Sequence, residues 1–223
     1  MSPLSLARQA HARIIEMIFS GAIAPGDALQ EAKLGDVLEM SRTPVREAIK
    51  RIEAEGLAAR DGRFLRVRRL TRAEVEEIFF LRGALESYSA GAATSLPAAD
   101  LDAIEARIRA LMDTGPEAGS PGEEEEEGEE HWRVDNAFHR LLAGATGNAV
   151  LLRTVDDLRL RTCMFDHTQV PERFRRGCEE HLRILDALRA ADGPAAARLM
   201  AAHVAGARDA ILARIDTLSG QTR

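Results

Sequence analysis

The first third of the chain carries apolar residues at helical spacing. This pattern predicts a helix over residues 6–19, a turn at residues 24–27 and a shorter helix over residues 31–38. A third helix is predicted from Ser41, because apolar residues then follow at one face of a helical repeat: Val45, Ala48, Ile49 and Ile52. Two short helices joined by a tight turn are typical of a helix-turn-helix.

The period of the pattern changes after Gly56. Residues 57–60 and 64–68 read as two short strands, and Asp61-Gly62 between them supplies the positive backbone angles of a tight hairpin turn. Arginines in the second strand make this hairpin basic. Three helices followed directly by a basic hairpin predict a winged helix-turn-helix domain over residues 1–70.

From Thr71 onwards the pattern is helical throughout. Thr71 and Glu74 fit a capping box at the start of a helix that runs towards Ala93. Residues 114–127 are predicted to be a solvated loop, although their glutamates could instead extend the next helix at its start. Further helices are predicted over residues 101–112, 130–144, 148–166, 173–190 and 194–218. The expected fold class is mainly α, with an all-helical antiparallel bundle over residues 71–223.

Charge divides the chain at the same place. The net charge is −6. Residues 1–72 hold 13 Lys and Arg against 9 Asp and Glu, whereas residues 73–223 hold 17 against 27. A basic front part suits a polyanionic partner such as double-stranded DNA, and an acidic rear part does not.

Cysteine usage and hydropathy limit the class of protein. Cys163 and Cys178 form no Cys-x-x-Cys pair, which excludes a zinc ribbon and a thioredoxin-like redox motif. The first residues lack the apolar region of a signal peptide, and no apolar run approaches the ~20 residues of a membrane helix. We therefore expect a cytoplasmic protein that does not enter the membrane.

The third predicted helix has a cationic face beside its apolar stripe. Arg42, Arg46 and Lys50 recur every four residues, so one side of the helix can pack while the other meets DNA. Arg42 or Arg46 would read guanine, and Lys50 would contact phosphate. The alternative is an ordinary amphipathic surface helix whose arginines point into water, and the neighbouring elements favour DNA.

Four polar residues of the rear part are candidates for a metal site. Asp135 and His139 are four residues apart and share a helix face. His181 precedes Asp192 by eleven residues and His203 follows it by eleven, so a turn near Asp192 would bring the two imidazoles to the same height. One carboxylate and three imidazoles suit a divalent ion, and the sequence does not distinguish Zn, Ni, Mn or Fe.

Other readings of these residues stay open. Asp135 and His139 are also compatible with a surface pair, and His203 with a hydrogen-bonded core residue. His131 or His167 would be a substitute ligand if the helix register differed from the predicted one.

The motifs resemble those of GntR-type bacterial regulators. The front part does so through PGDALQE at residues 25–31, SRTPVREAI at 41–49 and EGL at 55–57. The rear part is similar to the FCD effector domain of the FadR subfamily, through Arg82-x-x-x-Glu86, Asp135-x-x-x-His139, Gly147-Asn148, His181 and His203. Together these blocks cover nearly the whole chain.

The resemblance implies a homodimer that binds a pseudo-palindromic operator. It implies DNA contacts from Arg42, Thr43 and Arg46, with the hairpin tip at Gly62 and Arg63 reaching the minor groove. In the rear part it implies that the four candidate residues hold a metal ion and that a small organic acid is the effector.

One position departs from the family pattern. Ala32 stands where many relatives place an arginine that contacts DNA. Lys33 is one residue further on, which is about 100° of helix face, so it is not expected to replace that arginine.

We therefore hypothesise a metabolite-responsive transcription regulator and not an enzyme, with the effector carboxylate on the metal and on Arg82 or Arg161. A metal-sensing repressor is an alternative that differs only in what is sensed. A metal-dependent hydrolytic enzyme is less favoured, because its general base would have to be Glu86 or Asp166, neither of which lies in a catalytic motif, and because it leaves the front domain without a role.

Overall fold

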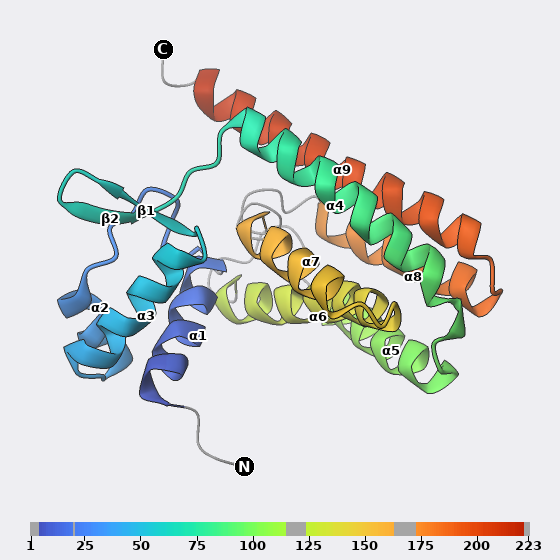
Figure 1. Ribbon diagram of the computed structural model, residues 1–223, viewed down its shortest axis with the longest axis horizontal. Helices are drawn as coiled ribbons and strands as arrows, with labels where there is room; N and C mark the ends of the chain where they lie inside the picture. The colour runs from blue at the N-terminus through green and yellow to red at the C-terminus, as the bar shows by residue number, and fades with distance from the viewer. Residues whose placement is uncertain (1–4, 20, 115–123, 163–172, 221–223) are drawn as a thin grey trace. The chain divides into compact units, whose positions relative to one another are not determined.

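The computed structural model describes residues 5–19, 21–114, 124–162 and 173–220 (Figure 1). The chain divides into two compact units, Met1–Leu70 and Thr71–Arg223. None of the described helices combines the length and the apolar character that crossing a lipid bilayer requires.

Three helices and a hairpin make up the first unit, in the order α1 (Leu6–Phe19), α2 (Glu31–Leu38), α3 (Arg42–Ala54), β1 (Ala58–Asp61) and β2 (Phe64–Val67). The predicted apolar stripes form its core, since Ile14, Val45 and Ile52 are each 0% exposed. The winged helix-turn-helix predicted for the front of the chain is confirmed.

The hairpin has a two-residue loop. Its strands pair antiparallel with Asp61 opposite Phe64, which leaves Gly62 and Arg63 at the tip. Gly62 has a φ of 58°, the positive value that the first position of such a loop needs and that a side chain would resist.

The segment before α2 adds to this hairpin, which the sequence pattern did not predict. The amide of Leu29 donates to the carbonyl of Leu65 at 2.9 Å, and the amide of Val67 donates to the carbonyl of Asp27 at 2.9 Å. The contact is a bridge and not a full strand, so it leaves no alternation of apolar and polar residues that the sequence could reveal.

Every regular element in the described residues of the second unit is a helix. Its elements are α4 (Arg72–Ala92), the short 3-10 helix η1 (Ala93–Ser95), α5 (Ala98–Thr114), α6 (Glu124–Ala145), α7 (Ala149–Thr162), α8 (Arg173–Arg189) and α9 (Gly193–Gly220). The predicted capping box is present, because the Thr71 side chain accepts from the Glu74 amide and Glu74 accepts from the Thr71 amide at 2.9 Å. The predicted helical bundle is confirmed.

Two predicted boundaries need comment. The predicted loop over 114–127 is wrong in its last part, since α6 already begins at Glu124. Glutamates are good helix formers and their charge is favourable in a first helical turn, so the alternative that they extend the helix is the correct one. The last described residue of α7 is Thr162, and the end of the helix predicted over 148–166 lies outside the described residues.

Helices α4 and α9 run antiparallel, side by side, along the second unit (Figure 1). Their close approach depends on Gly193, because a Cβ added there would lie 2.5 Å from the carbonyl oxygen of Gly91. The pairing holds together the two helices that carry Glu86 and His203.

Candidate functional site

Three helices of the second unit bring the four candidate metal ligands together. Asp135 and His139 come from α6, His181 from α8 and His203 from α9. One potential ligand atom from each residue lies within 4.8 Å of those of the other three. The three histidines are buried and Asp135 is partly buried. The predicted equal height of two imidazoles is realised, since Nε2 of His181 and Nε2 of His203 are 3.2 Å apart.

Two of the histidine Nε2 atoms face the Asp135 carboxylate. Oδ1 of Asp135 lies 3.8 Å from Nε2 of His139 and 3.6 Å from Nε2 of His181. Within the part of the chain that the structure describes, Nε2 of His139 is buried and has no hydrogen-bond partner. A buried acceptor without a partner is unfavourable, and a cation shared by these nitrogens would satisfy it.

Two carboxylates fix the orientation of two of these imidazoles by contacting the other ring nitrogen, Nδ1. The Glu86 carboxylate contacts Nδ1 of His139. Oε2 of Glu180 lies 2.9 Å from Nδ1 of His203. A proton on each Nδ1, on the side of its carboxylate, leaves the lone pair of Nε2 directed into the cluster, which is the tautomer that suits a metal ion there.

The protonation states also fit a metal ion. Burial, with the charge of Arg159, lowers the pKa of His139 to about 4. Burial, with the charge of His203, holds the pKa of His181 well below its ordinary value. Burial alone would raise the pKa of Asp135, but the Arg159 guanidinium and the nearby imidazoles hold it well below the ordinary value. Neutral imidazoles and an ionised carboxylate are the forms that bind a cation.

Arginines neutralise the carboxylates around the cluster. Arg159 is 1% exposed, contacts Asp135 and lies 3.5 Å from Oε2 of Glu86. Arg173 donates to Glu180 at 2.9 Å and to the carbonyl of His203 at 3.0 Å. Burial alone would raise the pKa of Glu180, but its hydrogen bonds with the His203 imidazole and with Arg173 lower it to about 2.

The two arginines predicted to bind an effector lie differently. Arg82 is buried and donates to Glu86 at 2.7 Å and to Oγ1 of Thr162 at 2.8 Å, so it lies one layer behind the cluster. Arg161 is partly buried, and its Nε has no hydrogen-bond partner among the described residues.

Sequence reasoning missed Arg159. It follows Val155 by four residues on the buried stripe of α7, and this spacing was the available signal.

The two histidines named as substitute ligands and the two cysteines, whose thiolates could also bind a metal, are outside the cluster or outside the described residues. His131 packs edge-on against Phe174, with ring centroids 4.7 Å apart. Cys178 is buried, and burial with the charge of Asp135 raises the pKa of its thiol to about 12, which disfavours the thiolate form that binds metals. Cys163 and His167 lie outside the described residues.

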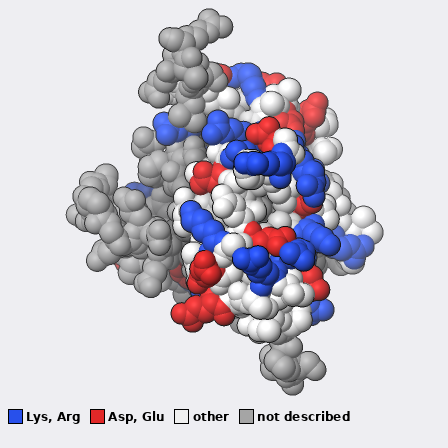
Figure 2. Space-filling model, turned by 90° about the vertical axis from the view of Figure 1, so that its left-hand side faces the viewer, with Lys and Arg blue, Asp and Glu red and all other residues white. Residues whose placement is uncertain are grey.

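In the first unit, α3 has the two faces that its sequence predicts. Val45, Ala48, Ile49 and Ile52 are buried, whereas Arg42, Thr43, Arg46 and Lys50 are exposed. Gly62 and Arg63 are also exposed, at the hairpin tip. Figure 2 shows Lys and Arg side chains gathered on the face that it displays, with Asp and Glu side chains between them.

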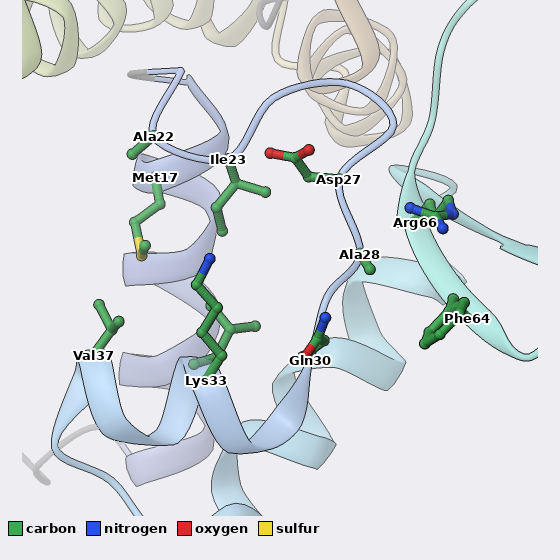
Figure 3. Close-up of a pocket in the computed structure, with 11 residues that line it drawn as sticks. Met17, Ala22, Ile23, Asp27, Ala28, Gln30, Lys33, Val37, Phe64 and Arg66 are labelled. Carbon is green, nitrogen blue, oxygen red and sulfur yellow. The ribbon is translucent and has the colours of Figure 1, made fainter.

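A hollow of about 350 Å³ lies elsewhere in the first unit, between α1, α2 and the hairpin (Figure 3). Lys33 lines it together with Met17 and Val37. Lys33 is exposed beside this hollow, and Ala32 is not among the residues that line it.

Comparison with known proteins identifies the family. The model of the bacterial regulatory proteins of the gntR family matches residues 6–63, and the FCD domain model matches residues 77–206. The chain belongs to the GntR family and carries the C-terminal FCD domain of the FadR-like subfamily.

Relatives of known name are transcriptional regulators. The chain is 29% identical over 188 residues to the transcriptional repressor RspR of Escherichia coli K12, covering 82% of this chain and 78% of RspR. It is 30% identical over 199 residues to the Nta operon transcriptional regulator of Aminobacter aminovorans, covering 88% and 90%. It is 28% identical over 224 residues to LutR of Bacillus subtilis, covering 87% and 96%. These relatives are regulators and not enzymes, as the sequence predicts for this chain.

Solved structures share the fold. E. coli McbR/YncC matches with a TM-score of 0.74 and 22% identity, over 99% of this chain and 100% of that chain. A GntR regulator from Rhodococcus sp. RHA1 matches with a TM-score of 0.75 and 19% identity, over 94% and 99%.

The orientation of His203 by Glu180 leads to a prediction. Glu180→Gln should weaken the binding of Zn²⁺ by about 10- to 100-fold, because the imidazole loses the carboxylate that fixes its tautomer. Competition with a chromogenic chelator measures this affinity. Glu179→Gln, an exposed neighbour on α8, is the matched control and should leave the affinity unchanged. Equal affinities of the Glu180→Gln variant and the unmodified protein would contradict this role.

Proposed function

We propose that this protein is a cytoplasmic, metabolite-responsive transcription regulator, which binds operator DNA as a homodimer and responds to a small organic acid at a metal site. The convergence of Asp135, His139, His181 and His203 in the second unit of a chain whose first unit is a winged helix-turn-helix carries this proposal. We propose that these four side chains hold a divalent ion. When bound, the ion would supply a Lewis-acid anchor for a carboxylate.

The effector carboxylate would also need a guanidinium. We propose Arg159 as its direct partner, because this arginine contacts Asp135. Arg82 would act through Glu86, to which it donates at 2.7 Å. Arg161 is retained as a further contact, because its Nε lacks a partner among the described residues. The effector can alter DNA binding only if it binds one arrangement of the dimer better than the other.

In the first unit, we propose that Arg42, Thr43 and Arg46 contact the operator in the major groove. Lys50 would contact phosphate, and Gly62 with Arg63 would reach the minor groove. The exposure of all six residues supports this assignment.

An apolar stripe on α4 supports the homodimer. Phe80 is 76% exposed and Tyr88 is 63% exposed, and with Ala84 between them they recur every four residues on one helix face. Leu81 beside them is 47% exposed. Monomeric proteins seldom leave such a contiguous apolar surface in water. We propose that this stripe meets a second copy of the chain.

The DNA-binding assignment is tested by Arg46→Ala. A duplex selected by the unmodified protein from a random library serves as the operator. The variant should bind it about tenfold or more weakly in a gel-shift assay, because a bidentate arginine–guanine pair is lost. Arg214→Ala removes an exposed arginine of the second unit and should bind normally. Unchanged binding of Arg46→Ala would refute the assignment.

The dimer is tested by Phe80→Asp. The substitution should raise the monomer–dimer dissociation constant about tenfold or more in analytical ultracentrifugation, because it places a charge where apolar area is buried. Val150→Asp introduces the same charge at a residue that is 64% exposed on α7 and should leave the dimer intact. A dimer that survives Phe80→Asp would place the interface elsewhere.

The effector site is tested by thermal shift of the Zn²⁺-loaded protein against a panel of small organic acids. A matching acid at 100 times its dissociation constant should stabilise the protein by about 2.7 kcal/mol. The shift should disappear in Arg159→Gln and after metal removal by a chelator. If no acid shifts the melting temperature and operator affinity follows metal concentration alone, the protein is a metal-sensing repressor instead.

A further inference from the structure

An ion pair joins the N-terminus of α2 to the predicted DNA-reading face of α3. Arg46 donates from Nε to Oε1 of Glu31 at 2.9 Å and from Nη2 to Oε2 of Glu31 at 2.7 Å. Both hydrogen bonds run between the same two planar groups, so the pair is bidentate and fixes the plane of the guanidinium as well as its position.

The exposure of this pair limits its contribution to the stability of the fold. The Arg46 side chain is 54% exposed and the Glu31 side chain 36% exposed. Ion pairs as exposed as this contribute little to stability. The surroundings of Glu31 are nevertheless distinctive: the hydrogen bonds from Arg46 are the main cause of its lowered pKa, and the charges of Arg42 and Lys50 lower the pKa further. Glu31 is thus the carboxylate among the three cations of the α3 face.

The geometry decides which edge of Arg46 stays available. Glu31 takes the edge that carries Nε and one proton of Nη2. The opposite edge, with one N–H from each terminal nitrogen, then points away from Glu31. These two parallel donors match the O6 and N7 acceptors of a guanine in the major groove.

We propose that Glu31 is a positioning residue for sequence readout, which orients Arg46 so that its terminal edge contacts a guanine. This inference rests on the proposed function of Arg46. An arginine held in its binding geometry loses less conformational entropy when DNA binds. The same carboxylate repels phosphates, and therefore it disfavours binding to duplexes that lack a correctly placed guanine.

The test measures specificity, which a merely structural role would not change. Full-length Glu31→Gln protein is compared with the unmodified protein on two duplexes of equal length, the selected operator and a scrambled sequence. The variant should bind the operator more weakly and the scrambled duplex more tightly, so that the ratio of the two affinities falls about tenfold or more. On the scrambled duplex, the slope of log binding constant against log salt concentration should become more negative by about one, because a released Arg46 can contact a phosphate.

Asp36→Asn is the matched control. It removes one exposed negative charge from the same helix and should leave the affinity ratio unchanged. Far-ultraviolet circular dichroism and the melting temperature of each variant verify that the fold is retained. An unchanged ratio in Glu31→Gln, or an equal fall in Asp36→Asn, would overturn the proposal.

A double-mutant cycle separates this inference from the function on which it rests. In an Arg46→Ala background, Glu31→Gln should cause no further loss of specificity, because the group that it positions is absent. If Arg46→Ala weakens operator binding but Glu31→Gln does not alter specificity, only the role of Glu31 is overturned. If Arg46→Ala has no effect on operator binding, the assignment of Arg46 fails and the role of Glu31 fails with it.

Replacing guanine by 7-deazaguanine in the operator gives a second readout. The modified base lacks the N7 acceptor, so the unmodified protein should lose affinity at the position that Arg46 reads. The Glu31→Gln variant should lose less affinity at that position, because its Arg46 is no longer held with both terminal nitrogens towards the guanine. An equal loss in both proteins would contradict the proposed orientation.

Discussion

The second unit depends on the pairing of charges that its fold removes from water. Glu86 is only 2% exposed, yet the Arg82 and Arg159 guanidiniums and the His139 imidazole surround it closely enough to hold its pKa well below the ordinary value. A carboxylate buried without such partners would cost several kcal/mol, whereas a fully partnered one is tolerated. The network joins α4, α6 and α7, and a second one through Glu180 joins α8 to α9.

This arrangement explains why the metal-ligand candidates are so well oriented. Each of the two anchoring carboxylates holds an imidazole on one side and a guanidinium on the other. The imidazoles cannot rotate without leaving a buried carboxylate short of a partner. The Nε2 atoms are therefore directed inward by groups that do not themselves belong to the cluster.

In the first unit, by contrast, the side chains proposed to act are exposed to water and not buried. Its functional side chains must be exposed to reach a duplex, and exposed arginines are flexible and freely hydrated. Apolar residues on the other face of α3 anchor the helix, with Val45 and Ile52 fully buried, while Glu31 restrains Arg46 from outside. Burial fixes the geometry in the effector-binding unit, and a surface ion pair fixes it in the DNA-binding unit.

The sequence by itself determined most of the helices, the hairpin and the four members of the candidate metal site. Helical periodicity places Val45 and Ile52 on one face, a four-residue step places Asp135 beside His139, and equal distances from one turn place His181 opposite His203. Only the tertiary structure decided which charged groups support them: Arg159 on Asp135, Glu180 on His203, and Glu31 on Arg46. The reason is that periodicity within a helix is a local property, whereas the partner of a charged side chain depends on how separate helices pack. Many charged residues of this chain have a spacing that would allow them to be such a partner, and the spacing alone does not choose between them.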